Sequence, residues 1–350
     1  MPNIVTEMKS MKKNIVMAIF VTFAILAAGW YMLNRSVTGF EEESRLFYIP
    51  SDSADAGLVL EKLRKEKILK STWFYEWLAE RKDYAKKVKP GRYRMTKGMN
   101  QMEVFTRLYK GDQEPLRFVI NKFRTREDFA RYAGKQMECL DTDILAFLNS
   151  PDSVARMGLD TNNAMTMIIP NTYAVFWNTP AHELLKRMGT ERDRFWTAER
   201  KQKAADAGLT KEEVYILASI IEEETNKHDE KPIMASVYIN RLRKGMTLSA
   251  DPTVKFALRN FGLKRILLTH INASAASPYN TYKNKGLPPG PICTPSIKTI
   301  DAVLNASETD YVFFCAKADF SGYHSFAANE KDHFNNARAY QKALDSLLVK

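Results

Sequence analysis

The stretch Ile216-Leu-Ala-Ser-Ile-Ile-Glu-Glu-Glu-Thr225 decides how this chain is interpreted, because its pattern predicts a helix that is buried along one side. Thr210 followed three residues later by Glu213 forms a capping-box pattern, which predicts that the helix begins there and runs through Thr225. At about 100° per residue, one side of this helix is apolar. The residues on that side are Val214, Leu217, Ile220 and Ile221.

Glu224 falls on the apolar side of this helix, whereas Glu222 and Glu223 fall on its flanks. A carboxyl group among aliphatic side chains loses hydration, which raises its pKa and lets it keep a proton near neutral pH. A general acid needs that property. Periodicity alone leaves a second interpretation open, in which the three adjacent acids form a solvated helix end.

The composition is that of a folded protein. The chain has 350 residues, of which 45% are hydrophobic and 27% charged, so there is room for two domains and a sizeable core. Cys139, Cys293 and Cys315 are widely spaced and odd in number, which predicts buried free thiols rather than a disulfide framework or a zinc site. His324 and His333 favour structural, hydrogen-bonded roles. The sequence therefore implies neither a metal nor a cofactor.

The N-terminal segment is the one part that does not fit a globular protein. Ile15 to Leu33 form an uncharged run of 19 residues, just long enough to cross a hydrocarbon core of about 30 Å. Lysines precede this run and Glu41-Glu-Glu43 follow it, so the N-terminus is expected in the cytoplasm and the rest outside. A signal peptide cleaved near Leu26-Ala-Ala28 is the alternative. Because the apolar run continues to Leu33, we favour an uncleaved anchor.

Export also changes how the net charge of +11 is interpreted. A protein outside the cytoplasmic membrane rarely meets nucleic acid, so anionic lipid or an acidic wall polymer is the better match. The basic residues are scattered apart from one local cluster, which we expect to be a solvated surface. That cluster consists of Lys82, Lys86, Lys87, Lys89 and Arg92.

The pattern of elements predicts an α+β fold with a small module followed by a larger mixed α+β domain. The expected parts are a cytoplasmic N-terminus (1–14), a transmembrane helix (15–33), a linker (34–44), the small module (45–115) and the larger domain (116–350). Strands are expected at 46–49, 93–95, 118–120 and, as a buried strand, 311–316. Helices are expected at 54–67, 72–81, 102–109, 126–137, 141–148, 181–205, 210–225, 230–244 and 336–347.

Two later stretches combine aromatic, amide and hydroxyl side chains with stiffening prolines. They are Ser277-Pro-Tyr-Asn-Thr-Tyr282 and Gly286-Leu-Pro-Pro-Gly290. Such a combination suits a preorganised groove for a polar, carbohydrate-like ligand, on which rings stack and amides form hydrogen bonds. An ordinary proline-rich loop is an equally good interpretation of composition alone.

Five motifs occur in order along the chain. They are Ala218-Ser-Ile-Ile-Glu-Glu-Glu-Thr225, Ala235-Ser-Val-Tyr-Ile-Asn-Arg-Leu242, Asp251-Pro-Thr-Val254, Tyr279-Asn-Thr-Tyr282 and Gly286-Leu-Pro-Pro-Gly290. Together they closely resemble the endolytic murein transglycosylases (MltG/YceG-like). The resemblance covers the N-terminal anchor, a LysM-like module at residues 45–115 and a transglycosylase catalytic domain at residues 116–350.

This resemblance implies that Glu224 is the catalytic residue, the same residue that the helical pattern selects. It also implies cleavage of the MurNAc-β-1,4-GlcNAc bond within glycan strands, leaving 1,6-anhydro-MurNAc ends and ending the elongation of nascent strands. The implied partners are peptidoglycan glycan strands, the bacterial cytoplasmic (inner) membrane and peptidoglycan synthases, with no nucleic acid. The expected substrate-binding residues are Asn240, Arg241, Asp251, Thr253, Tyr279, Asn280, Thr281 and Tyr282.

Three departures from the family pattern affect these expectations. Glu223 stands where Lys is frequent, and its charge is expected to raise the pKa of Glu224 further. Ser249-Ala250 stands where a Gln is common, and Pro295-Ser296 where Pro-Gly is usual, so the finer substrate contacts stay open. Two other functions also stay open. One is a muramidase-type hydrolase with Asp251 as second carboxylate, and the other is a peptidoglycan-binding scaffold without turnover.

Overall fold

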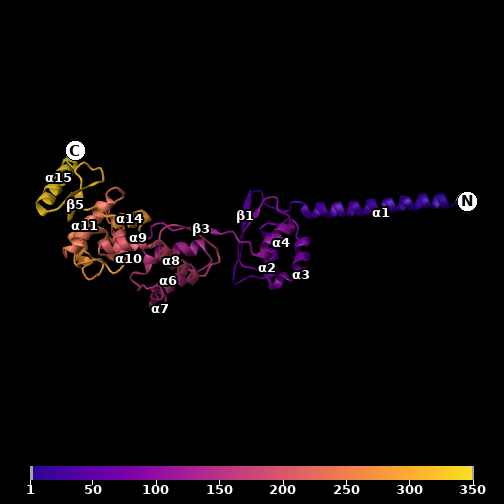
Figure 1. Ribbon diagram of the computed structural model, residues 1–350, viewed down its shortest axis with the longest axis horizontal. Coiled ribbons are helices and arrows are strands. Elements are labelled where there is room, and N and C mark those ends of the chain that lie inside the picture. Colours follow the sequence, from indigo (N-terminus) through magenta and orange to yellow (C-terminus); the bar gives the residue numbers. More distant parts are fainter. Residues whose placement is uncertain (1–2, 349–350) are drawn as a thin grey trace. The chain divides into compact units, whose positions relative to one another are not determined.

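The computed structural model describes residues 3–348 and divides into two compact units (Figure 1). Unit 1 comprises Met1–Leu116 together with Phe176–Asn178, and unit 2 comprises Arg117–Val175 together with Thr179–Lys350. The described part of the chain is mixed α+β and mostly helical, with three separate two-stranded sheets. The α+β class expected from the sequence is therefore confirmed, while the finer domain assignments stay predictions.

Helix α1 (Asn3–Asn34) forms the N-terminal segment of unit 1. Within it, Met11–Tyr31 is apolar enough and long enough to cross a membrane, with a mean hydropathy of 1.9. None of the described side chains in that stretch is buried against the rest of the protein. The helix is thus consistent with a single-pass anchor or a signal sequence, at nearly the residues expected from the sequence.

The rest of unit 1 packs helices against an antiparallel pair of strands, β1 (Ser44–Ile49) and β2 (Gly91–Thr96). In their register Phe47 faces Tyr93, and both side chains are fully buried. The helices are α2 (Ala56–Lys65), α3 (Trp73–Arg81), the 3-10 helix η1 (Tyr84–Lys86) and α4 (Gln101–Lys110). Asn100 and Glu103 cap α4 reciprocally, which satisfies backbone N–H groups that the first turn leaves free.

One residue of the basic cluster is buried, although the whole cluster is expected to be solvated. Arg92 is buried, and its guanidinium donates to the carbonyl oxygens of Glu114 and Pro115 at 3.2 and 2.5 Å. The four lysines of the cluster are exposed, as a solvated surface requires. Arg92 therefore ties the segment after α4 to strand β2.

Unit 2 holds most of the helices of the chain. Its elements, with β3 beginning at the last residue of unit 1, are β3 (Leu116–Val119), α5 (Arg126–Gln136), α6 (Asp141–Asn149), α7 (Pro151–Ala155), η2 (Ala164–Met167), β4 (Thr172–Val175), α8 (Ala181–Phe195), α9 (Ala198–Asp206), α10 (Lys211–Glu224), α11 (Lys231–Arg243), α12 (Asp251–Ala257), α13 (Leu268–Ala273), α14 (Ile297–Leu304), β5 (Phe313–Ala316), β6 (His324–Ala327) and α15 (Glu330–Leu348).

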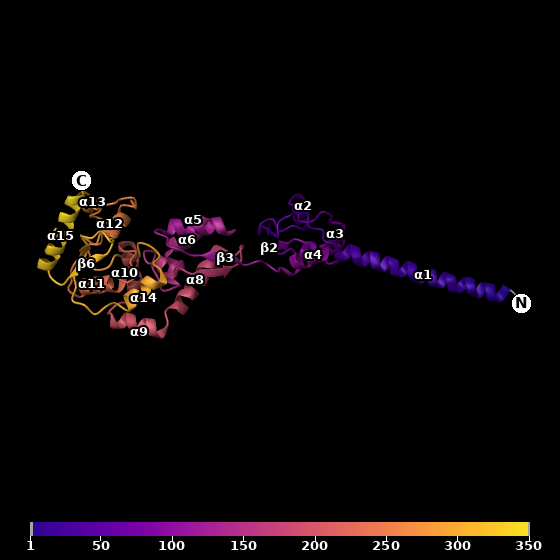
Figure 2. The ribbon, with the colours of Figure 1, turned by 90° about the horizontal axis from the view of Figure 1, so that it is seen from above.

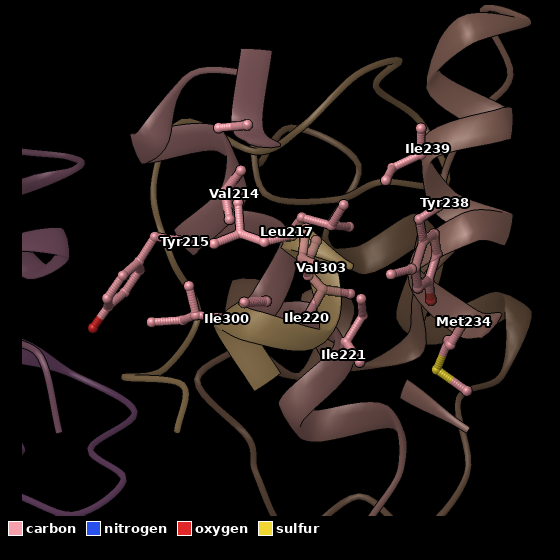
Figure 3. Close-up of a cluster of buried hydrophobic side chains, with 14 of the residues drawn as sticks. Val214, Tyr215, Leu217, Ile220, Ile221, Met234, Tyr238, Ile239, Ile300 and Val303 are labelled. Carbon is pink, nitrogen blue, oxygen red and sulfur yellow. The ribbon is translucent and has the colours of Figure 1, made fainter. Parts of the chain in front are cut away.

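Helix α10 is the centre of the unit 2 core and packs against α11, α12 and α14. Its capping box forms as predicted, with Glu213 accepting from the backbone N–H of Thr210 and Thr210 accepting from that of Glu213. Figure 3 shows its apolar residues together with Met234, Tyr238 and Ile239 of α11 and Ile300 and Val303 of α14. All residues from 214 to 221 are buried. The helix is therefore buried on all sides over two turns, more than the predicted single apolar side.

Most predicted elements differ from the structure only in their bounds, the closing helix beginning at Glu330 rather than at residue 336, but two differ in kind. The helix expected over 181–205 is broken into α8 and α9, because Trp196 turns into the core and Thr197 caps α9 by accepting from the N–H of Arg200. The strand expected to be buried, 311–316, is the short strand β5, whose residues are half-exposed. Within residues 3–348 it pairs only with β6, and α15 packs against this hairpin (Figure 2).

Candidate active site

Glu224 is the last residue of α10, and its side chain is half-buried. Its Oε1 accepts a hydrogen bond from the hydroxyl of Tyr238, with an O–O distance of 2.8 Å. Tyr238 lies on α11, has no exposed surface and packs its ring edge-on against Phe314 of β5. Because the buried tyrosine is fixed by the core, it also fixes the orientation of the carboxyl group.

The environment of Glu224 favours its neutral form. Burial raises the pKa of Glu224 to about 7; the hydrogen bond from Tyr238 opposes this rise, and the negative charge of Asp251 adds to it. Glu224 therefore keeps its proton at pH values where an exposed glutamate has lost it. This is the property that the helical pattern predicted for the residue, and it suits a group that first donates a proton and then accepts one.

Asp251 is the first residue of α12, which packs against α10. The hydroxyl of Tyr282 donates to Asp251 Oδ1 at 2.6 Å. Burial and the neighbouring carboxylate both raise the pKa of Tyr282, so this phenol stays protonated as the donor. The site thus holds two carboxyl groups, each bound by one tyrosine hydroxyl.

The two flanking acids of α10 are engaged in ion pairs away from Glu224. Glu222 binds Lys231, whose Nζ lies 2.8 Å away and whose side chain is 3% exposed. Glu223 binds Lys122 and Arg124, each at 2.9 Å. Burial opposes the ionisation of both acids, but these cations hold the pKa of each below its usual range.

The flanking ion pairs correct one expectation from the sequence. Glu223 was expected to raise the pKa of Glu224, but Lys122 and Arg124 balance its charge. The like charge that raises the pKa of Glu224 comes from Asp251 instead.

Two of the expected substrate-binding residues bind the backbone of neighbouring segments. Arg241 donates to the carbonyl oxygens of Val312 and Leu248 at 2.6 and 2.7 Å. The amide of Asn240 donates to the carbonyl oxygens of Thr309 and Tyr311 at 2.7 and 3.0 Å. Both side chains therefore attach the segment before β5 to α11.

Three more of the expected binding residues are fully buried in the structure. The hydroxyl groups of Thr253 and Thr281 are 2.8 Å apart, and Thr281 also accepts from the backbone N–H of Ala250. The amide of Asn280 donates to the carbonyl of Ile271 and the hydroxyl of Ser274. These bonds hold the 277–282 loop against the start of α12 and the end of α13.

The rings of Tyr279 and Tyr282, in the same loop, are half-buried. The Tyr279 ring packs on Phe256, with 4.7 Å between the ring centroids. The structure thus brings Asp251 and Tyr282 to Glu224, whereas Asn240, Thr253, Asn280 and Thr281 shape the loops around it. Substrate contacts by these residues stay a prediction.

A family model described as the YceG-like family matches residues 47–339. The chain belongs to the YceG-like family. The resemblance expected from its five motifs is therefore confirmed.

Two named relatives are similar to this YceG-like chain over most of its length. The endolytic murein transglycosylase of Bacillus subtilis (strain 168) is 28% identical over 305 residues, and the alignment covers 81% of each chain. The endolytic murein transglycosylase of Streptococcus pneumoniae (strain R6) is 27% identical over 369 residues. That alignment covers 93% of this chain and 64% of the streptococcal protein, so this chain spans only about 64% of that relative.

A crystal structure of a YceG-like protein from Listeria monocytogenes has the same fold. It matches with a TM-score of 0.56 and 23% sequence identity, covering 84% of this chain and 99% of the other. At that identity the match supports the fold alone.

Sequence reasoning missed Tyr238 as a site residue of this YceG-like protein, although the residue lies within one of the five motifs. The signal is its position: Tyr238 lies on the helix after α10, on the side that helical periodicity turns toward the core. A buried phenol needs a partner for its hydroxyl. Glu224 is that partner.

His324 takes the hydrogen-bonded role expected for it, whereas His333 stacks its ring on Phe313 at 5.0 Å between ring centroids and its Nδ1 has no hydrogen-bond partner among the described residues. Glu230 accepts from the backbone N–H of His324 at 2.7 Å and lies 3.1 Å from its ring Nδ1. Cys139, Cys293 and Cys315 are free thiols, as predicted, but only Cys293 is buried. Within residues 3–348, no group of three or more His, Cys, Asp or Glu side chains is arranged to hold a metal ion.

Proposed function

We propose that this protein is a membrane-anchored endolytic peptidoglycan transglycosylase. Its substrate is the MurNAc-β-1,4-GlcNAc bond within glycan strands, and its products carry 1,6-anhydro-MurNAc ends. The observation that carries this proposal is Glu224, a half-buried carboxyl group with a pKa raised to about 7 and oriented by Tyr238. The names of the Bacillus and Streptococcus relatives support the same reaction.

In the first step Glu224 acts as a general acid. Because Tyr238 donates to Oε1, we place the proton of neutral Glu224 on Oε2, which donates it to the glycosidic oxygen. The bond between that oxygen and C1 of MurNAc breaks, the GlcNAc hydroxyl leaves, and positive charge develops at C1 and the ring oxygen. The carboxylate left behind keeps its hydrogen bond from Tyr238, which stabilises the new charge.

In the second step the same residue acts as a general base. The Glu224 carboxylate takes the proton of the C6 hydroxyl of the same MurNAc, O6 bonds to C1, and Glu224 is neutral again. One carboxyl group is sufficient, because the attacking hydroxyl belongs to the substrate and lies close to C1 throughout. Asp251, bound by Tyr282, favours protonation of Glu224 before the first step, and its negative charge stabilises the positive charge that develops at C1.

Helix α1 and the LysM-like module are suited to an enzyme that cleaves nascent glycan at the membrane. In this proposal α1 anchors the protein in the bacterial cytoplasmic membrane, with the catalytic domain outside. The LysM-like module binds N-acetylglucosamine-containing glycan, and cleavage beside peptidoglycan synthases ends strand elongation. The apolar Met11–Tyr31 stretch supports the anchor.

A muramidase-type hydrolase is the second candidate, because one observation favours it. Asp251 is close enough to Glu224 to influence its pKa, and glycoside hydrolases place two carboxyl groups on either side of the scissile bond. In that reaction water rather than O6 would attack C1, and the products would carry ordinary reducing ends.

Mass spectrometry of purified sacculi digested by the full chain in detergent tests the proposal. We expect 1,6-anhydro products from the parent protein and from Glu223→Gln, and none from Glu224→Gln. The Glu223 variant is a matched control, since it makes the same chemical change one residue away on the same helix. Reducing ends would support the hydrolase instead. Glycan binding without products from the parent protein would support the scaffold.

A further inference from the structure

Helix α3 of unit 1 exposes two large rings that the proposed reaction does not use. Trp73 is 58% exposed and Trp77 is 47% exposed. They are four residues apart and so share one side of the helix, with Arg81 one turn further on. The guanidinium of Arg81 lies 5.1 Å from the centroid of the Trp77 ring. We call Trp73, Trp77 and Arg81 the α3 face; exposed aromatic surface of this kind indicates an interaction site.

The chain that leaves α1 is hydrogen-bonded to the segment just before α3. The backbone N–H of Lys70 donates to the carbonyl of Val37 at 2.7 Å, and Thr38 pairs with Leu69 in an antiparallel bridge. Val37 is three residues beyond Asn34, the end of α1, a reach of at most about 10 Å. Trp73 follows Lys70 by the same number of residues. With about 5 Å across the hydrogen-bonded pair, a membrane-spanning α1 therefore holds the start of α3 within about 25 Å of its own end.

The charge around the α3 face fits an anionic surface. Lys70, Arg81 and Lys82 are exposed at its two ends. The segment 70–87 contains five basic and three acidic residues, and one of those acids, Glu76, is paired with Arg64. Tryptophan with flanking basic residues is typical of the membrane–water interface, where the ring lies at headgroup level and the cation meets lipid phosphate.

We infer that the α3 face docks on the outer surface of the membrane that α1 crosses, with Trp73 and Trp77 among the lipid headgroups. Glycan strands also stack on tryptophan, but the short tether from α1 and the positive flanks favour the lipid surface. The inference rests on the proposed anchor role of α1 and is independent of the proposed reaction. Unit 1 is then attached to the membrane at two points, α1 and the α3 face.

Quenching of tryptophan fluorescence by brominated lipid tests this directly. The full chain carrying Trp30→Phe, which removes the tryptophan of α1, is reconstituted in phosphatidylethanolamine–phosphatidylglycerol vesicles with bromine near the headgroup end of the acyl chain. We expect quenching in this protein and its loss when Trp73→Ala and Trp77→Ala are added. Trp177→Phe is the matched control and should keep the quenching, since the Trp177 ring packs on Tyr48 within unit 1.

Each other outcome overturns the inference. Absence of quenching in protein that co-floats with the vesicles would mean that α1 anchors the chain while the α3 face stays in water. Quenching that persists in the Trp73→Ala/Trp77→Ala protein would assign it to another ring. Quenching by N-acetylglucosamine oligomers instead of lipid would make the α3 face a glycan platform. Failure to co-float would reject the anchor itself, without bearing on the chemistry of Glu224.

Discussion

Replacing Tyr238 by Phe should move the pH dependence of the reaction upward. The substitution keeps the buried ring but removes the hydroxyl that donates to Glu224 Oε1 at 2.8 Å. A hydrogen bond to a charged group contributes about 1.5 to 3 kcal/mol, and one pKa unit corresponds to about 1.4 kcal/mol. Because this bond stabilises the ionised form of Glu224, its loss should raise the pKa of Glu224 from about 7 by about 1 to 2 pH units.

The assay is the pH dependence of kcat/KM for release of 1,6-anhydro products from glycan strands. Activity requires neutral Glu224 and should fall as the pH rises through its pKa, so the alkaline limb moves upward in Tyr238→Phe. Tyr215→Phe is the matched control: this residue of α10 is equally buried, but its hydroxyl donates to the carbonyl of Ile168. An alkaline limb that stays in place or moves down in Tyr238→Phe would refute the assignment of Glu224 as the acid.

Three further predictions follow from the same contacts. Asp251→Asn removes the like charge beside Glu224, so the alkaline limb of the variant's pH profile should move down by up to about 1 pH unit. The variant's products should keep 1,6-anhydro ends. A parent protein that makes reducing ends, and a variant that makes none, would contradict this prediction. Glu224 has a higher pKa folded than unfolded, so its contribution to stability is present below pH 4.5 and is lost as the pH rises through 7. Glu224→Gln should therefore gain unfolding free energy over the parent, by at most about 3 kcal/mol, between pH 5 and pH 8 in thermal unfolding. Lys231→Met leaves Glu222 without its cation and should destabilise the protein by about 3 kcal/mol, with most of this recovered in Lys231→Met/Glu222→Gln; a double variant as unstable as the single one would show that the ion pair is not the cause.

The sequence was sufficient where short-range rules decide structure. The capping box of Thr210 and Glu213 located the start of α10, and helical periodicity placed Glu224 toward the core. A capped, periodic segment leaves few alternatives, because the same residues satisfy the backbone and bury the apolar side.

Other parts depend on contacts between segments that are far apart in the chain. The break between α8 and α9 follows from burial of Trp196, and the orientation of Glu224 from Tyr238 on another helix. Asn280 has a side chain suited to ligand binding, but it is buried and donates its amide to the carbonyl of Ile271 on α13. Side-chain amides and hydroxyls serve loops and ligands equally well, so composition alone does not separate the two roles.

The source of the oxygen at the new sugar end tests the central claim most directly. Sacculi are digested by the full chain in water enriched in oxygen-18, and the released muropeptides are weighed by mass spectrometry. If Glu224 directs attack by the C6 hydroxyl, the new MurNAc ends contain no oxygen-18 and are about 18 Da lighter than ordinary reducing ends. Incorporation of one oxygen-18 atom at those ends would show attack by water and contradict the single-carboxyl mechanism.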